Sequence, residues 1–538
     1  MAKWQTKEEL KDLLTKLVQH ASVTGSPEEI AISEYLQIRL RELDYFRENP
    51  NLLQLHPTSD GRKFITALVK KGSSKKTVIL LSHFDVVDVE DYGEWKNLAF
   101  QPHYLTNEFK RQKDEVPEEV RYDIENGDWL FGRGTMDMKA GTTLQMSMIE
   151  QACEGKFDGN VLLLSVCDEE ANSTGMIEAV EVLNDLARQH DLDYQAFLNS
   201  EPIFTQFPGD QSHYIYSGSV GKVLPGFFCY GRETHVGEPF AGLNANFMVS
   251  QLTQALELNT DFCEQVEGEV TPPPTNLMQK DLKEGYSVQS PHSAVTNFNI
   301  LTMEQPLENL NTELLKVAKQ SASRMEQHYL QKAKQFSQWQ AFEPVDFQIN
   351  VFTYEELWEM AVEAYGKDEI ERRQAYIIAN FQELGDRDLS TRLVSDLSAL
   401  CKDRAPMIVL FYNPPFYPAV SSRNDPYIQA VIEKVTNYSE KNHHISLKHQ
   451  RFFPGLSDLS FTGMRQSANA LFPLVSNMPL YGNGYDLPFD ALRDLNVPVM
   501  NLGPLGRDPH KWTERLELDY SFVTLPDMLS YTIDELLK

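Results

Sequence analysis

The chain has 538 residues, of which 41% are hydrophobic, and its formal net charge is −29 at pH 7. This length exceeds what one hydrophobic core usually serves, so the sequence predicts a globular protein of two or three domains. The acidic excess argues against binding to nucleic acid or to an anionic membrane surface, because both require clustered Lys and Arg.

Cysteine usage favours a reducing compartment. The five cysteines are widely spread and never form a C-x-x-C pair, so neither a disulfide framework nor a thiolate zinc site is expected. No apolar run approaches the roughly 20 residues that a membrane span requires. We therefore expect a cytoplasmic protein with no membrane or nucleic-acid partner.

The first 200 residues alternate between helical and extended patterns. Helical leucine spacing starts at Leu10 and a capped helix at Ser26, and a densely charged loop is predicted over residues 107–128. Apolar, β-branched runs predict strands over residues 64–69, 77–81, 161–166 and 196–198. Strands that alternate with helices favour a largely parallel sheet.

The pattern changes after residue 201 and later returns to its first form. An α+β layer is predicted from strands at 214–230, 295–302 and 347–353 and from helices at 244–258 and 307–336. Strands at 407–412, 445–453 and 497–502 resume the α/β pattern. We expect four segments: an α/β domain with a mostly parallel sheet flanked by helices over 1–210, an inserted α+β domain over 211–353, a helical region of open membership over 354–405, and the rest of the α/β domain over 406–538.

Two polar sites stand out in the first segment, one at a predicted strand end and one in a predicted turn. His83 and Asp85 lie two residues apart at a strand end, where a carboxylate or carbonyl can hold the second nitrogen of a ligating imidazole, although a structural histidine is the simpler alternative. Asp137 lies in a glycine-rich turn, which lets the backbone approach an ion closely. A phosphate loop is disfavoured because Lys139 is followed by Ala140, not by Ser or Thr.

Three consecutive acids, Asp168, Glu169 and Glu170, follow the apolar strand at 161–166. The carboxyl edge of a parallel sheet is where such folds hold their ligands. Carboxylates so close raise one another's pKa unless a cation neutralises them, so a metal is expected. A solvated acidic turn is the alternative, and the acidic strand end of a nucleotide hydrolase is a third possibility that lacks its phosphate loop.

Glu201 at another strand end and His510 near the C-terminus complete the set. Together these residues offer two imidazoles and three or four carboxylates. That mixture of nitrogen and oxygen ligands suits zinc or a similar divalent ion.

The order of these motifs resembles the dizinc aminoacylase, acetylornithine deacetylase and glutamate carboxypeptidase family. The resemblance implies a zinc-exopeptidase-like catalytic domain with an inserted ferredoxin-like lid and dimerisation domain. It covers nearly the whole chain, through residues 82–85, 132–141, 168–170, 201–202, 455–458 and 503–514.

The resemblance also assigns a role to each metal-site residue. It implies that Asp137 bridges two divalent ions, Zn²⁺ in the first place with Co²⁺ or Mn²⁺ as alternatives. His83 and Glu201 would complete one ion's site, and Glu170 and His510 the other.

Catalytic roles follow from the same resemblance. Asp85 would orient His83, and Glu169 would take the proton of the attacking water and pass it to the leaving amine. Hydrolysis would then need no covalent nucleophile, in agreement with the lack of a serine or cysteine elbow motif.

Substrate contacts are implied for residues outside the metal site. His235 would stabilise the oxyanion in a partner subunit, and Asn244, Gly455 and Ser457 would contact substrate, with a helix cap as the plain alternative for Asn244. The arginine with which many relatives grip a substrate carboxylate is missing, since Phe298, Asn299 and Ile300 fill that stretch. A free α-carboxylate is therefore not implied.

Taken together, the sequence predicts a metal-dependent hydrolase that cleaves an amide bond, N-acyl or peptide, in a small amino-acid-derived substrate. Arginine utilisation is a candidate context, and a homodimer through the inserted domain is expected. The alternatives are a peptidase for short peptides and, in another class, a metal-binding regulatory protein without turnover.

Overall fold

The computed structural model describes residues 3–207, 209–464 and 468–538. The chain forms two compact units. The first unit comprises Met1–Val220, Pro418–Arg465 and Pro488–Lys538, and the second comprises Gly221–Tyr417 and Gln466–Leu487. The second unit is thus inserted into the first. None of the helices in these described ranges has the length and apolarity required to cross a lipid bilayer.

The first unit is built on an eight-stranded mixed sheet. Its central strands β5, β3, β6 and β18 run parallel to one another, whereas β1 and β2 are antiparallel to their neighbours. The strand order is β1 (Leu53–Pro57), β2 (Lys63–Val69), β5 (Asn160–Val166), β3 (Lys76–His83), β6 (Asp193–Asn199), β18 (Val499–Asn501), β7 (His213–Tyr216), β17 (Leu447–Gln450).

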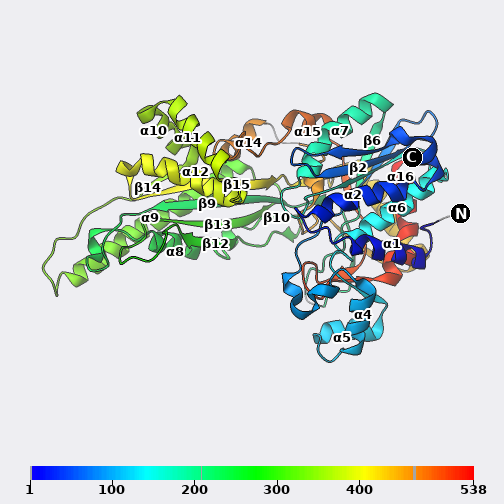
Figure 1. Cartoon of the computed structure of the whole chain (residues 1–538), viewed down its shortest axis with the longest axis horizontal. Coiled ribbons are helices and arrows are strands. Elements are labelled where there is room, and N and C mark those ends of the chain that lie inside the picture. The colour runs from blue at the N-terminus through cyan, green and yellow to red at the C-terminus, as the bar shows by residue number, and fades with distance from the viewer. Residues whose placement is uncertain (1–2, 208, 465–467) are drawn as a thin grey trace. The chain divides into compact units, whose positions relative to one another are not determined.

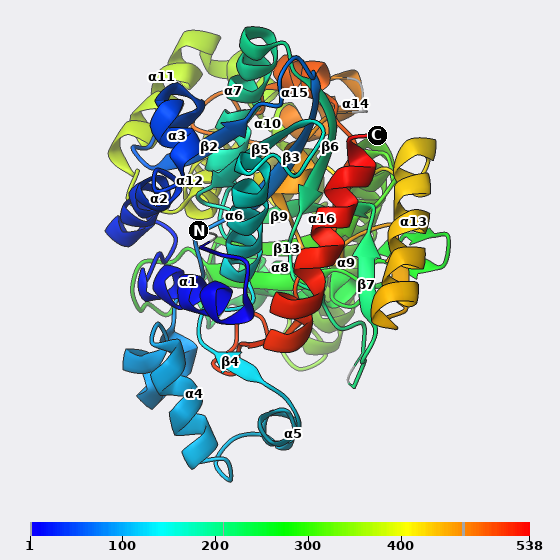
Figure 2. The ribbon, with the colours of Figure 1, turned by 90° about the vertical axis from the view of Figure 1, so that its right-hand side faces the viewer.

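Helices cover both faces of this sheet. Figure 1 shows α7 on one side of the strands and α6 on the other, and Figure 2 shows α1 and α16 beside α6. The sheet flanked by helices confirms the predicted α/β class. The helices of this unit with seven or more residues are α1 (Lys7–Gln19), α2 (Pro27–Leu40), α4 (Pro102–Arg111), α5 (Glu118–Asn126), α6 (Lys139–Cys153), α7 (Thr174–His190), α13 (Pro426–His443), α15 (Phe489–Leu495) and α16 (Leu525–Leu536).

Local sequence explains why these helices form where they do. At the start of α1 the Thr6 side chain accepts from the Glu9 backbone and the Glu9 carboxylate accepts from Thr6, which is a capping box. Pro27 occupies the first turn of α2, where its missing N–H costs nothing. The amino ends of α1 and α2 can therefore both be recognised in the sequence.

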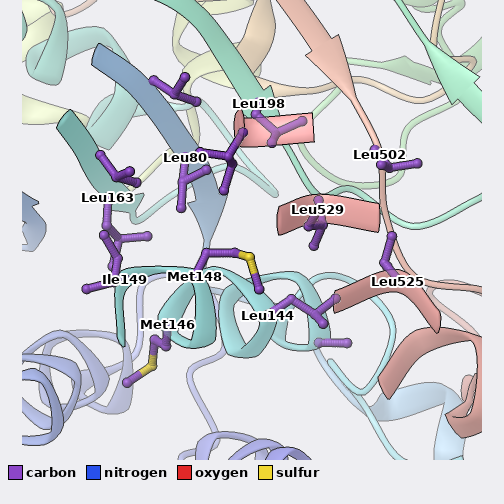
Figure 3. Packing of buried hydrophobic residues seen from close by; sticks show 14 of the residues in the cluster. Leu80, Leu144, Met146, Met148, Ile149, Leu163, Leu198, Leu502, Leu525 and Leu529 are labelled. Atoms are coloured by element: carbon purple, nitrogen blue, oxygen red, sulfur yellow. The ribbon is translucent and has the colours of Figure 1, made fainter. Parts of the chain in front are cut away.

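The core of the first unit lies between α6 and the sheet. Figure 3 shows Leu144 and Met148, four residues apart on α6, facing Leu80 of β3 and Leu198 of β6. All four side chains are buried. Burial of one such side chain contributes about 1.5–3 kcal/mol to stability. This packing holds α6, which begins two residues after Asp137, against the sheet.

The charged stretch at 107–128 is not a loop. It contains the end of α4 and all of α5, which pack with η2 (Glu90–Leu98) and β4 (Trp129–Phe131) around a small aromatic core. Phe109, Val116 and Val120 are buried in it at near-helical spacing. The many surface charges obscured this apolar stripe. β4 also joins β20 (Arg515–Glu517) and β19 (Gly506–Arg507) in a three-stranded sheet.

The second unit contains a five-stranded sheet with helices on both faces. Its order is β12 (Thr275–Asp281), β13 (Ser293–Thr302), β9 (Gly221–Tyr230), β15 (Met407–Tyr417), β14 (Asn350–Thr353). In Figure 1 the helices α8 (Ala245–Leu256) and α9 (Leu307–Phe336) lie on one face, and α10 (Tyr354–Tyr365), α11 (Lys367–Asn380) and α12 (Asp386–Leu400) lie on the other.

The boundaries of the units differ from the expected ones. Residues 354–405, whose membership the sequence left open, belong to the second unit, because Leu357 and Leu397 are packed with Phe228 and Phe411 of its sheet. The strand at 407–412, expected in the α/β domain, is β15 of the second unit, where it pairs with β9. Conversely, β7 lies in the first unit's sheet.

Candidate metal centre

Three neighbouring parallel strands end at one edge of the first unit's sheet. β3 ends at His83, directly opposite Val166 of β5, and Leu81 is opposite Asn199 of β6. The acidic residues that follow β5 and β6 therefore emerge beside His83. The carboxyl edge of a parallel sheet is the usual ligand side of such folds.

The first group of ligand atoms surrounds the buried Nε2 of His83. This atom lies 3.3 Å from Asp137 Oδ1 and 3.5 Å from Glu201 Oε1. All three side chains are buried. These atoms lie close enough together to coordinate one ion.

The second group shares Asp137 with the first. His510 Nε2 lies 3.3 Å from Asp137 Oδ2 and 3.1 Å from Glu170 Oε1. The two oxygens of Asp137 thus face different histidines. The structure therefore brings together all five residues that were proposed as metal ligands, and two of its candidate groups are the two proposed sets. A further group joins His83 and Glu170 with Glu169.

Asp85 supports the centre through both its main chain and its side chain. His83 Nδ1 lies 3.0 Å from the Asp85 carbonyl oxygen and 3.6 Å from its carboxylate, so the carbonyl is the closer acceptor. An N–H on Nδ1 leaves the Nε2 lone pair for a metal. The Asp85 carboxylate accepts from the backbone nitrogens of Glu169 and Glu170, at 3.1 and 3.2 Å. The expected orienting role of Asp85 thus extends to the acidic turn.

Glu169 lies beside the first group. Its Oε2 is 3.9 Å from His83 Nε2. Burial raises the pKa of the Glu169 carboxyl well above its usual value, and the nearby carboxylates of Asp458 and Glu201 raise it further, whereas His83 lowers it. Burial also raises the pKa of Glu201.

The donor set fits divalent cations. His83 Nε2 is buried and makes no hydrogen bond with the residues that the structure describes, although carboxylate oxygens surround it. Three buried or nearly buried carboxylates would repel one another without a cation. Imidazole nitrogens with carboxylate oxygens, three ligands for each ion and one of them shared, are typical of zinc sites that keep an open position.

Glu514 is a site residue to which the sequence analysis gave no role. Its side chain is fully buried. Oε1 accepts from the backbone nitrogens of Met136 and Asp137 at 3.2 and 3.4 Å, and Oε2 accepts from Arg133 Nη1 at 2.9 Å. Glu514 therefore ties the turn of Asp137 to the C-terminal segment that carries His510. The only sequence signal was its place in the motif at 503–514.

Asp458 is a second residue that the sequence analysis did not single out. It is buried, and burial raises the pKa of its carboxyl to about 7. It follows Ser457, whose hydroxyl oxygen accepts from Asn199 Nδ2 at 2.9 Å and from the Leu459 backbone at 3.2 Å. A Cβ added to Gly455 would lie 2.7 Å from the Phe453 ring, so a larger residue would not fit there. Substrate contacts by Gly455 and Ser457 stay predictions.

His235 and Asn244 lie in the second unit. His235 Nδ1 accepts from the Gly237 backbone at 3.0 Å. Asn244 caps α8, with its side-chain oxygen accepting from the Asn246 backbone at 2.9 Å, so the helix-cap alternative accounts for its position. The catalytic role of His235 and the substrate contact of Asn244 stay predictions.

Full-length relatives share this chain's sequence. The protein YqjN of Bacillus subtilis (strain 168) is 55% identical over 536 residues, which cover 99% of this chain and 97% of that protein. Protein RocB of the same organism is 32% identical over 551 residues, which cover 99% of this chain and 95% of RocB.

The fold is also that of solved structures. The aminopeptidase PepT from Bacillus cereus superposes with a TM-score of 0.55 at 11% identity, covering 99% of this chain and all of PepT (100%). A likeness at this identity shows the fold alone. The sequence model of peptidase family M20/M25/M40 matches residues 79–484. The motif order, the two groups of ligand atoms around Asp137 and these similarities agree: the chain belongs to peptidase family M20/M25/M40, and it is a hydrolase of that family.

Proposed function

We propose that this chain is a dizinc hydrolase that cleaves an amide bond, N-acyl or peptide, in a small amino-acid-derived substrate. The observation that carries the proposal is the shared Asp137, whose two oxygens face His83 and His510 at 3.3 Å each. A carboxylate in this position suits two ions that act on one substrate. Arginine utilisation remains a predicted context for this reaction.

The residues around the ions would divide the chemistry. His83, Asp137 and Glu201 would hold one ion, and Asp137, Glu170 and His510 the other. Divalent ions bound there, Zn²⁺ in this proposal, supply Lewis acidity, which lowers the pKa of water to about 7 and stabilises developing negative charge.

Glu169 is the proposed general base and acid. Its carboxylate takes a proton from the attacking water and returns that proton to the leaving nitrogen. A carboxyl whose pKa is raised by burial, as that of Glu169 is, binds and releases a proton closer to neutral pH. Because water is the nucleophile, no Ser or Cys is required.

A short-peptide peptidase is the second candidate, favoured by the family's description as peptidases. The same residues would act in both cases, so substrate assays decide between them. Turnover of N-acetyl amino acids above that of dipeptides supports the first candidate, and the reverse order supports the second. A regulatory protein without turnover is disfavoured, because both groups of ligand atoms and the base are present.

The test of the proposal uses Glu169→Gln, with Glu181→Gln as a matched control on the exposed surface of α7. Metal content is measured by elemental analysis, and hydrolysis is measured on acylated amino acids and dipeptides. Glu169→Gln is expected to keep both metals and to lose activity. The control Glu181→Gln is expected to keep both metals and its activity. Activity of Glu169→Gln equal to that of the native enzyme would show that the base is another residue.

A homodimer through the second unit is part of the proposal. β12 is an outer strand of its sheet, and Leu277 on β12 has 56% of its surface exposed. Outer strands with exposed apolar side chains are ready to pair with another chain. Light scattering on the native protein and on Leu277→Lys tests this expectation.

A further inference from the structure

One cavity lies entirely within the second unit. It has a volume of about 480 Å³ and is lined by residues of β9, β12, β13, β15 and the first turn of α12. The residues that line it include the apolar Leu224, Leu277 and Met278. The helical region at 354–405, which contributes α12, thus helps to build a pocket on the sheet.

Two buried carboxamides line this cavity. Asn297 is 3% exposed and Asn413 is 1% exposed. Among the described residues, neither Oδ1 nor Nδ2 of Asn297 has a hydrogen-bond partner, and Oδ1 of Asn413 has none. Buried polar atoms are nearly always hydrogen-bonded, so three such atoms around one cavity indicate a ligand that completes them.

The sheet makes room for these carboxamides. Asn297 of β13 is opposite Gly226 of β9, and a Cβ at that glycine would lie 2.7 Å from Asn297 Oδ1. Asn413 of β15 is opposite Leu224, two residues from Gly226, so both carboxamides lie on the same face of the sheet. The absence of a side chain at Gly226 therefore leaves room for the Asn297 carboxamide beside the Phe411 ring, which would lie 2.5 Å from the same Cβ.

Two cations, Lys280 and Arg387, lie on the rim of the cavity. Lys280 pairs with Asp388 at 2.6 Å. Arg387 is exposed on the first turn of α12, and no ion pair joins it to any residue in the described part of the chain. A guanidinium in this position suits a carboxylate on the ligand.

We propose that this pocket binds a small carboxylate that contains an amide group, such as an N-acyl amino acid or a dipeptide. The amide N–H and C=O pair with the carboxamides of Asn297 and Asn413, the aliphatic part contacts Leu224 and Met278, and the carboxylate meets Arg387. The choice of ligand class rests on the proposed function, but the pocket is built from residues of the second unit alone.

The test measures calorimetric binding of N-acetyl-L-leucine to the full, metal-loaded chain carrying Glu169→Gln, which prevents turnover. When Asn297→Leu is added to this chain, we expect the calorimetric titration to lose one binding site for N-acetyl-L-leucine, or the affinity for this probe to fall at least tenfold. Asn380→Leu, at an exposed position on α11 of the same unit, is the matched control and should bind as before. No binding of the probe, or the same binding with Asn297→Leu, would overturn the proposal.

Two further measurements separate folding and charge from binding. Asn297→Leu should keep or raise the melting temperature without ligand, because it replaces an unpaired buried amide by an apolar group of similar size. Arg387→Gln should lower the affinity for N-acetyl-L-leucine several-fold. The affinity for N-acetyl-L-leucinamide, which has no carboxylate, should stay unchanged. Equal weakening of both probes would contradict the assigned role of Arg387.

The outcomes distinguish this inference from the proposed function. If binding depends on Asn297 while the native enzyme hydrolyses no acylated amino acid or dipeptide, the pocket stands and the proposed function fails. If hydrolysis is observed but Asn297→Leu changes no binding event, the proposed function stands and the pocket assignment is wrong.

Discussion

Glu514 Oε1 accepts a hydrogen bond from the backbone nitrogen of Asp137 at 3.4 Å. The two residues are far apart in sequence, yet both are buried. The other Glu514 oxygen meets Arg133 at 2.9 Å. The turn that presents Asp137 to both histidines is thus held by a buried ion pair.

Glu514→Gln should weaken metal binding while leaving every ligand in place. The neutral amide keeps the shape but loses the charge-assisted bond to Arg133, so Asp137 is held less firmly. Changes to residues that support metal ligands usually cost about 10–100-fold in metal affinity. Competition with a fluorescent chelator measures this affinity, and excess metal should restore part of the activity. If Glu514→Gln binds metal as tightly as the control Glu181→Gln, Glu514 does not support the metal ligands.

Arg133→Met should destabilise the fold strongly. The Arg133 side chain is 1% exposed and its partner Glu514 is fully buried. Removal of one member of a buried pair leaves an uncompensated charge and typically costs about 3–5 kcal/mol. Urea unfolding measures the change. The pair Arg133→Met with Glu514→Leu should recover part of the loss, whereas a single-variant loss below about 1 kcal/mol would contradict burial of the pair.

Asp137→Asn and Glu201→Gln should differ in how many ions they lose. Asp137 lies in both groups of ligand atoms, whereas Glu201 lies in one. Asp137→Asn is therefore expected to weaken the binding of both ions. Glu201→Gln is expected to release one ion and to keep the other. Elemental analysis after dialysis gives the metal content. Retention of both ions by Asp137→Asn would exclude the shared position.

Metal removal should lower stability more at alkaline than at acidic pH. In the metal-free chain, burial raises the pKa of the Glu170 and Glu201 carboxyls above their usual values. A raised pKa in the folded state stabilises the fold below the unfolded pKa of about 4.3, and this stability is lost as pH rises. The difference in melting temperature between metal-loaded and chelated protein should widen from about pH 5.5 to about pH 8. A constant difference would contradict this expectation.

The ligand set could be predicted because it depends on local sequence and on one simple rule. His83 ends one apolar strand and Glu170 and Glu201 follow two others, and parallel strands bring their carboxyl ends to one edge. The family resemblance then divided the ligands between two ions and separated the base, Glu169, from them. Spacing alone would not have made that distinction.

The features that could not be predicted depend on contacts between residues that are far apart in the sequence. Glu514 acts through Arg133, 381 residues earlier in the chain, and nothing in either local pattern indicates the pair. Strand β15 looked like a strand of the α/β domain, because a buried apolar strand has the same composition in either unit. The helices at 107–128 were missed because their surface charges outnumber the apolar positions that pack inward.

The central claim is that Asp137 joins two metal ions in one centre. Anomalous X-ray diffraction from crystals of the metal-loaded protein, recorded at the zinc edge, tests it most directly. Two peaks about 3.5–4 Å apart are expected, one beside each oxygen of Asp137. A single peak, or peaks away from Asp137, would contradict it.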